Sequence, residues 1–124
     1  MKNLVFRSLL LVLSVLLSSI SVAEIGHLKG KVQNIRIHDG EVHQGWTPPV
    51  FWFTLKGVSS AGKCKLWNGN VLFVMETEAA YSLILATQMA DKEIAIRYDD
   101  TVLNSGQYWC KATYITTGNP APLY

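Results

Sequence analysis

Alternation of apolar and polar positions predicts that most of this chain forms short β-strands. In residues 29–46 β-branched residues recur, and Asp39-Gly40 in their midst is typical of a two-residue hairpin turn. The register of such a hairpin sorts the side chains onto two faces: Ile35, Ile37, Val42 and Trp46 on one, and Arg36, His38, Glu41 and His43 on the other. We expect the apolar face to be the core side.

The next apolar stretch, residues 50–56, predicts a third strand with heavy aromatic loading. Because Phe51 and Phe53 alternate with Trp52, both faces of the strand are apolar. The strand is therefore either buried on both sides or has one face covered by a partner. A loop at 57–62, an extended segment at 64–67, a turn at 68–70 and a strand at 71–75 continue the pattern.

A helical period replaces the strand period between residues 77 and 90. Thr77 is a suitable N-cap, Glu78 lies favourably in the first turn, and no Gly or Pro interrupts the segment. We expect a core-facing helix of about 15 residues. Its apolar stripe comprises Tyr81, Ile84, Leu85, Gln88 and Met89, with Ala80 and Leu83 beside it.

Strand periodicity returns after the helix. Residues 94–98 predict a strand, residues 99–106 a polar loop, and residues 107–117 the last strand. The order β-β-β-α-β-β predicts a mainly β fold with one helix: a small, five- to six-stranded barrel like the oligonucleotide/oligosaccharide-binding (OB) barrel, whose helix lies between its third and fourth strands. We expect one domain over residues 24–118 and an extended tail over 119–124.

The first 23 residues predict a cleaved export signal. Lys2 and Arg7 flank a positive start, residues 9–17 are largely apolar, and small residues precede a cleavage point after Ala23. An uncleaved anchor helix is the alternative, but it would need about 20 apolar residues. We expect a protein exported through the inner membrane, periplasmic or secreted, with no membrane association after cleavage.

Removing this segment changes the charge balance. The 124-residue chain has eleven basic and nine acidic residues and a net charge of +2, and Lys2 and Arg7 supply that excess. The mature chain is therefore neutral and has no overall electrostatic attraction for nucleic acid or an anionic membrane.

Cys64 and Cys110 are the chain's two cysteines. In an oxidising compartment we expect them to form a structural disulfide. The loop that it closes, about 46 residues, corresponds to roughly 4 kcal/mol in the chain-entropy model. A redox or zinc site is not favoured because no C-x-x-C pair is present.

Other polar residues give no clear active site. His38, Glu41 and His43, with His27 nearby, could hold a divalent metal, but a solvated polar face is the favoured interpretation and we expect no metal or cofactor. Asp99 and Asp100 would point to opposite sides of a strand, so they could not form a paired acid/base site, and we interpret them as part of a solvated turn. No nucleophile elbow or phosphate-binding loop occurs, and we expect the protein not to be an enzyme.

Aromatic residues are the candidate binding groups: Trp46, Trp52, Trp67, Tyr108 and Trp109. If Cys110 points to the core, Trp109 faces outward, where an aromatic ring can stack on a sugar or anchor a protein. Packing of Trp109 under the helix or in a subunit interface is an equally open alternative. The sequence thus favours a binding module for a glycan or protein partner. The alternative is an inhibitor or accessory protein of an exported hydrolase that uses loop 57–62 or 99–106.

Residues 81–96 (YSLILATQMADKEIAI), the earlier Gly30-Lys31-Val32-x-x-Ile35 strand and the two separated cysteines resemble a set of small exported bacterial proteins, mostly without assigned function. The order of elements in those proteins is similar to that of the B subunits of AB5-type toxins, which are pentameric glycan-binding barrels. The resemblance implies a barrel fold, a possible homo-oligomer and a glycan ligand.

Overall fold

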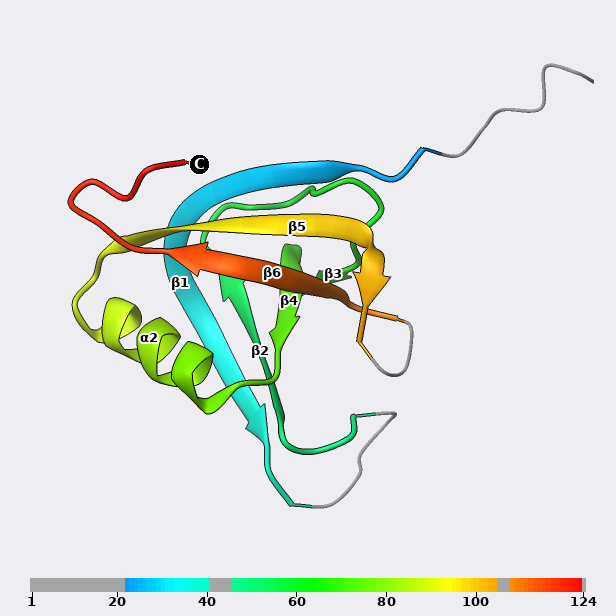
Figure 1. The fold of residues 1–124 in the computed structure, drawn as a ribbon, viewed down its shortest axis with the longest axis horizontal. Coiled ribbons are helices and arrows are strands. Elements are labelled where there is room, and N and C mark those ends of the chain that lie inside the picture. The colour runs from blue at the N-terminus through cyan, green and yellow to red at the C-terminus, as the bar shows by residue number, and fades with distance from the viewer. Residues whose placement is uncertain (1–21, 41–45, 105–107, 124) are drawn as a thin grey trace, which may run out of the picture.

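Six strands and one helix follow one another in the computed structural model, which describes residues 22–40, 46–104 and 108–123. The signal prediction for residues 1–23 lies almost wholly outside these ranges. Within them, no helix has the length and apolar character needed to cross a bilayer. The elements are β1 (Ile25–His38), β2 (Val50–Leu55), β3 (Leu66–Trp67), β4 (Asn70–Met75), α2 (Glu78–Met89), β5 (Glu93–Leu103) and β6 (Cys110–Thr116) (Figure 1).

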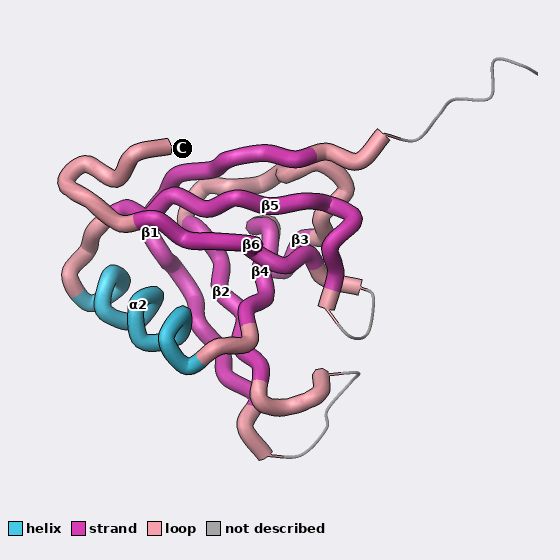
Figure 2. Tube along the Cα trace, in the orientation of Figure 1, coloured by secondary structure: helices cyan, strands magenta, loops and turns pink. Residues whose placement is uncertain are grey.

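Five of the strands close into a barrel. β1 pairs antiparallel with both β2 and β5, β2 pairs antiparallel with β4, and β5 pairs antiparallel with β6. A parallel contact between β4 and β6 at Val74 closes the barrel, and β3 pairs with the first two residues of β4. Figure 2 shows α2 lying in the connection from β4 to β5, below the barrel. This strand order and helix position are those of the OB barrel, so the predicted fold class is confirmed.

Strand β1 pairs with two neighbouring strands because it is long and bent. Its first half pairs with β5, its second half with β2, and the register shifts between Val32 and Asn34. The second half pairs with β2, where His38 lies opposite Val50, a register different from that of a two-residue turn at Asp39-Gly40. The predicted hairpin partner at residues 41–45 lies outside the described residues.

The predicted faces of this segment are wrong at its end. Trp46 does not share a face with Ile37, because its indole stacks on the His38 imidazole, with ring centroids 4.9 Å apart and planes 8° from parallel. Ile37 lies opposite Phe51 and shares its core-side face as expected, but it is next to last in β1 and 48% exposed. Trp46 can be buried on the outer face because Val50, Trp52 and other apolar residues form a second buried cluster there.

Two apolar layers result, one inside the barrel and one on its outer surface. Phe51, Phe53 and Leu55 of β2 point inward and pack with Phe73 and other core residues. Val50 and Trp52 point outward into a second buried cluster. Every residue of β2 is buried. The strand is thus buried on both sides, which was one of the two predicted possibilities.

The N-terminus of helix α2 is capped as the sequence predicts. Thr77 caps it, since its hydroxyl accepts a hydrogen bond from the Ala80 backbone N–H at 3.2 Å. The buried stripe is formed by Ala80, Ile84 and Thr87. Met89, expected on that stripe, is 80% exposed because the helical period places it on the side opposite Ala80.

Strand β5 extends through the segment predicted to be a polar loop. It continues to Leu103, so Asp99 and Asp100 lie within a strand and not in a solvated turn. Their side chains separate accordingly: the Asp99 carboxylate accepts a hydrogen bond from the Thr101 hydroxyl, whereas Asp100 is buried. Beyond β6, Ala121 is buried, so the predicted tail packs against the domain in part.

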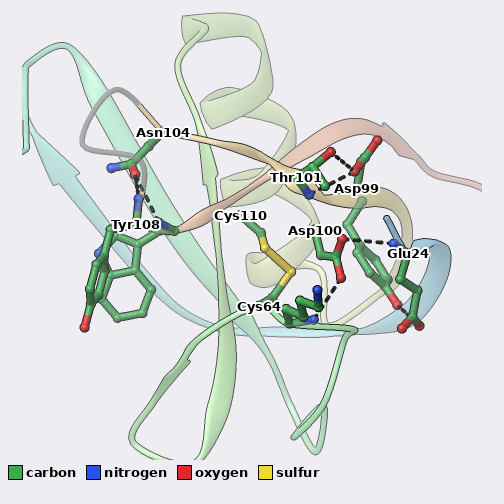
Figure 3. Close-up of a disulfide and its surroundings, with 11 residues drawn as sticks. Glu24, Cys64, Asp99, Asp100, Thr101, Asn104, Tyr108 and Cys110 are labelled. Carbon is green, nitrogen blue, oxygen red and sulfur yellow. Dashed lines mark hydrogen bonds between the residues drawn. A yellow bond between two sulfur atoms is a disulfide. The ribbon is translucent and has the colours of Figure 1, made fainter. Parts of the chain in front are cut away.

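The predicted disulfide is confirmed. Cys64, just before β3, is bonded to Cys110, the first residue of β6, with an S–S distance of 2.08 Å (Figure 3). Both cysteines belong to the core cluster inside the barrel. The bond ties the loop between β2 and β3 to the far end of the chain.

Candidate functional site

All four tryptophans of the chain gather on the outer face of β2 and β4. Trp52 comes from β2 and Trp67 from β3, whereas Trp46 and Trp109 come from the connections that precede β2 and β6. They surround an outward-facing apolar floor made by Val50, Leu72 and Val74. We call these four residues the tryptophan cluster.

The tryptophan cluster has two buried and two partly exposed members. Trp46 and Trp52, two of the candidate binding residues, are only 7% and 3% exposed and therefore offer a ligand little surface. Trp67 and Trp109 lie above them, with centroid distances of 4.7 Å from Trp52 to Trp67 and 6.1 Å from Trp46 to Trp109. These residues are buried because β2 has large apolar side chains on both faces, and other apolar residues cover those on its outer face.

Tyr108 extends this surface into solvent. Its ring is 50% exposed and meets the Trp109 indole edge-on, with centroids 4.9 Å apart. The Lys65 ammonium lies 3.5 Å from the Tyr108 ring centroid, a cation–π contact. We call the accessible surface of Trp67, Tyr108 and Trp109 the aromatic patch.

Arg36 of β1 adds a second cation to the aromatic patch. Its guanidinium carbon lies 5.1 Å from the Trp52 ring centroid and 5.8 Å from that of Trp67. The guanidinium thus borders both rings, while Lys65 borders Tyr108. Aromatic rings and hydrogen-bond donors therefore lie next to one another at this surface.

Asn104 fixes the position of the residues that form the outer part of the patch. Its side-chain oxygen accepts hydrogen bonds from the backbone N–H groups of Tyr108 and Trp109 at 3.1 and 3.0 Å (Figure 3). The Asn104 backbone N–H donates to the Trp109 carbonyl at 2.8 Å. Asn104 is 4% exposed. Sequence reasoning placed it in a polar loop and missed this role, which the preference of Asn for bonding nearby backbone N–H groups could have indicated.

The side chains of the last strand change their alternation part-way along it. Cys110 and Ala112 point into the barrel, but Tyr114 is 39% exposed. The pairing with β5 shifts register at Thr113, so the alternation of side chains inverts beyond this bulge. Tyr114 thereby turns outward on a different face of the barrel, where its hydroxyl lies 2.8 Å from His27 Nε2.

An open cavity of about 360 Å³ lies between the end of β1 and the start of α2, and Val50 of the apolar floor is one of its lining residues. Sequence analysis did not identify it. Its walls combine carboxylates with apolar and aromatic side chains: Ile37, Asp39, Pro49, Val50, Phe51, Glu76, Thr77, Glu78 and Tyr81. Glu76 is also paired with Lys111 at 3.0 Å.

The residues considered as metal ligands do not come together in the described part of the chain. No group of three or more His, Cys, Asp or Glu side chains there is placed to hold a metal ion. His38 stacks on Trp46, and His27 lies near the opposite end of β1. Glu41 and His43 lie outside the described residues.

Comparison with known proteins adds no relative. No family model matches the chain, and neither a curated protein sequence nor a solved structure matches it. The resemblance to small exported bacterial proteins and to toxin B subunits therefore stays a prediction.

Proposed function

We propose that this protein is an exported, non-enzymatic binding module that recognises a glycan through the aromatic patch. The observation that carries the proposal is the place of the patch on the barrel. In OB barrels, ligands bind at the face of the second and third strands, between the loops that join strands one to two and four to five. Here those strands are β2 and β4, and these two loops contribute Trp46 and Trp109.

The chemistry of the patch supports a sugar ligand. Exposed aromatic rings offer flat apolar surfaces on which the C–H face of a sugar can stack. Arg36 and Lys65, beside the rings, are hydrogen-bond donors suited to sugar oxygens. The buried Trp46 and Trp52 beneath the patch hold it in place before a ligand arrives, which reduces the entropic cost of binding.

The resemblance to toxin B subunits adds an expectation about assembly. A homo-oligomer would present several copies of the aromatic patch on one particle, and multivalent display raises avidity for clustered glycans. Light scattering on the exported protein measures this directly. A pentamer would favour the toxin-like lectin, and a monomer would favour the inhibitor alternative.

A protein ligand is the second candidate, favoured by Leu66. This residue of the edge strand β3 is 49% exposed, next to Lys65 and Trp67 of the patch. The hydrolase-inhibitor alternative has less support from the two loops that it would use. Ala61, in loop 57–62, is buried, and residues 99–103 are paired in β5, so these parts of the two segments are not free to enter a partner's cleft.

The proposal is tested by probing an array of immobilised oligosaccharides with the exported protein and two variants. Tyr108→Ala removes the most exposed ring of the patch, whereas Tyr114→Ala removes an exposed tyrosine from another face. We expect the wild type and Tyr114→Ala to bind the same glycans and Tyr108→Ala to lose at least about tenfold in affinity. An array without binding, or equal binding by all three proteins, would contradict the proposal.

A further inference from the structure

Glu24, the first residue after the predicted cleavage point, lies directly against a buried carboxylate. The Glu24 backbone nitrogen donates to Asp100 Oδ1 at 2.9 Å, and the Asp100 backbone N–H donates to the Glu24 carbonyl at 3.0 Å (Figure 3). Asp100 is only 8% exposed. The bond that joins residues 23 and 24 therefore ends at an atom already within hydrogen-bond distance of a buried acid.

The surroundings of Asp100 form a built site. Its second oxygen, Oδ2, accepts the Lys63 backbone N–H at 3.0 Å, and the Tyr98 hydroxyl donates to Glu24 Oε1 at 3.0 Å. Gly62 has φ +52°, and a Cβ atom there would lie 2.6 Å from Asp100 Oδ2. A side chain at position 62 would thus collide with the carboxylate, so glycine is needed for this close approach.

We propose that Asp100 receives the new amino terminus created when the Ala23–Glu24 peptide bond is hydrolysed. Water adds to the Ala23 carbonyl carbon, the C–N bond breaks, and Ala23 leaves as a carboxylate. The Glu24 nitrogen keeps the electron pair of that bond and binds protons to become an α-ammonium. This cation stays at the position of the amide nitrogen and forms an ion pair with the Asp100 carboxylate, which locks the start of β1 to β5.

The geometry requires little rearrangement for this pairing. Val22 is 76% exposed and Ala23 is also exposed, so the residues before the bond contribute little packing that cleavage would remove. A hydrogen bond between a charged donor and a charged acceptor is stronger than one from a neutral amide. A buried carboxylate without a charged partner carries a desolvation cost, which a cation beside it offsets in part. Processing would therefore tighten a contact that the uncleaved chain makes only with an amide.

The pH dependence of the pair follows from its charges. The titratable groups around the new terminus are the Glu24, Asp99 and Asp100 carboxylates, the Tyr98 hydroxyl and the Lys63 ammonium of the neighbouring loop. The net negative surroundings should raise the folded-state pKa of the α-ammonium above its ordinary value of about 7.7–8.0. The stabilisation is then complete below that ordinary value and is lost as the pH rises through the folded-state pKa. Burial raises the pKa of Tyr98 to about 12, so that residue stays protonated over this range.

The test starts with export of the full chain in a bacterial host and a mass measurement of the product, which should begin at Glu24. The pKa of its α-amino group is then measured by ¹⁵N NMR in the wild type, Asp100→Asn and Asp99→Asn. The last variant is a matched control, since it makes the same charge change one residue away, on a side chain bonded to Thr101. We expect the pKa in the wild type and in Asp99→Asn to exceed that in Asp100→Asn by about one pH unit or more.

A second measurement does not depend on whether Asp100→Asn folds. The same pKa is compared between native and urea-unfolded wild-type protein, and the native value should be higher by a similar amount. Equal native and unfolded values, equal values in the wild type and Asp100→Asn, or a product that begins at another residue would each overturn the proposal. Glycan binding is not used as a readout, so failure here leaves the proposed function unaffected.

Discussion

The indole of Trp109 stacks on that of Trp46, with ring centroids 6.1 Å apart and planes 13° from parallel. These residues come from two different connections of the barrel, the one before β6 and the one before β2. The contact therefore joins two loops that border the face of β2 and β4. Trp46 in turn stacks on His38 at the end of β1, so the support extends into the barrel itself.

Replacing Trp46 tests whether the outer apolar layer stabilises the fold. Because Trp46 is 7% exposed and lies between His38 and Trp109, Trp46→Ala should lower the free energy of unfolding by about 3–5 kcal/mol. Tyr108→Ala, at a half-exposed ring, should cost less than about 1 kcal/mol. Urea denaturation followed by circular dichroism measures both. Equal costs would show that the layer is not a second core.

Asn104 should control the aromatic patch without touching a ligand. Asn104→Ala leaves the backbone N–H groups of Tyr108 and Trp109 without their acceptor, which we expect to cost about 1–3 kcal/mol in stability and to weaken glycan binding. Asn104→Asp keeps an acceptor at the same place and should retain more of both properties. The result is read from denaturation curves and from array signals; an unchanged Asn104→Ala protein would refute the positioning role.

Loss of the disulfide should strongly lower the free energy of unfolding. The sequence separation of Cys64 and Cys110 is 46 residues, for which the chain-entropy model gives about 4 kcal/mol. The double variant Cys64→Ser/Cys110→Ser is expected to lose an amount of this order in a denaturant titration. Reductant should destabilise the wild type but leave the double variant unaffected. Insensitivity of the wild type to reduction would contradict this expectation.

Stability should fall at high pH because of Tyr98. Burial, followed by the hydrogen bond to Glu24, raises the pKa of this phenol from 10.0 to about 12. Since the folded-state pKa lies above the unfolded-state value, the stabilisation is complete below pH 10 and is lost as the pH rises toward 12. Tyr98→Phe should flatten this part of the stability profile. Equally steep profiles for Tyr98→Phe and the wild type would assign the loss to other groups.

Local patterns in the sequence predicted the order of elements because each pattern depends on neighbouring residues. The Thr77 cap and the aromatic strand at Phe51 are of this kind, and the structure confirms the helix and the strand. The disulfide was predicted from the cysteine count and the expected compartment, and the structure confirms it too. The partner of β1 depends on contacts between distant segments, so local turn chemistry at Asp39-Gly40 did not predict its register with β2.

Contacts between distant segments also explain why the sequence predicted the candidate site only in part. Alternation could indicate that some tryptophans lie outside the barrel, but not that Trp46 and Trp52 would be covered by Trp109 and Trp67. The roles of Asn104 and Asp100 depend on side-chain to backbone hydrogen bonds, which leave no periodic signal in the sequence.

The most direct test of glycan recognition uses the intrinsic fluorescence of the protein. All four tryptophans belong to the tryptophan cluster, so their emission reports on the face of β2 and β4. An oligosaccharide selected on the array is titrated into the wild type, Tyr108→Ala and Tyr114→Ala. We predict a saturable change in emission for the wild type and Tyr114→Ala, and none at the same concentrations for Tyr108→Ala. Binding that leaves the emission unchanged, or a full response in Tyr108→Ala, would contradict the account.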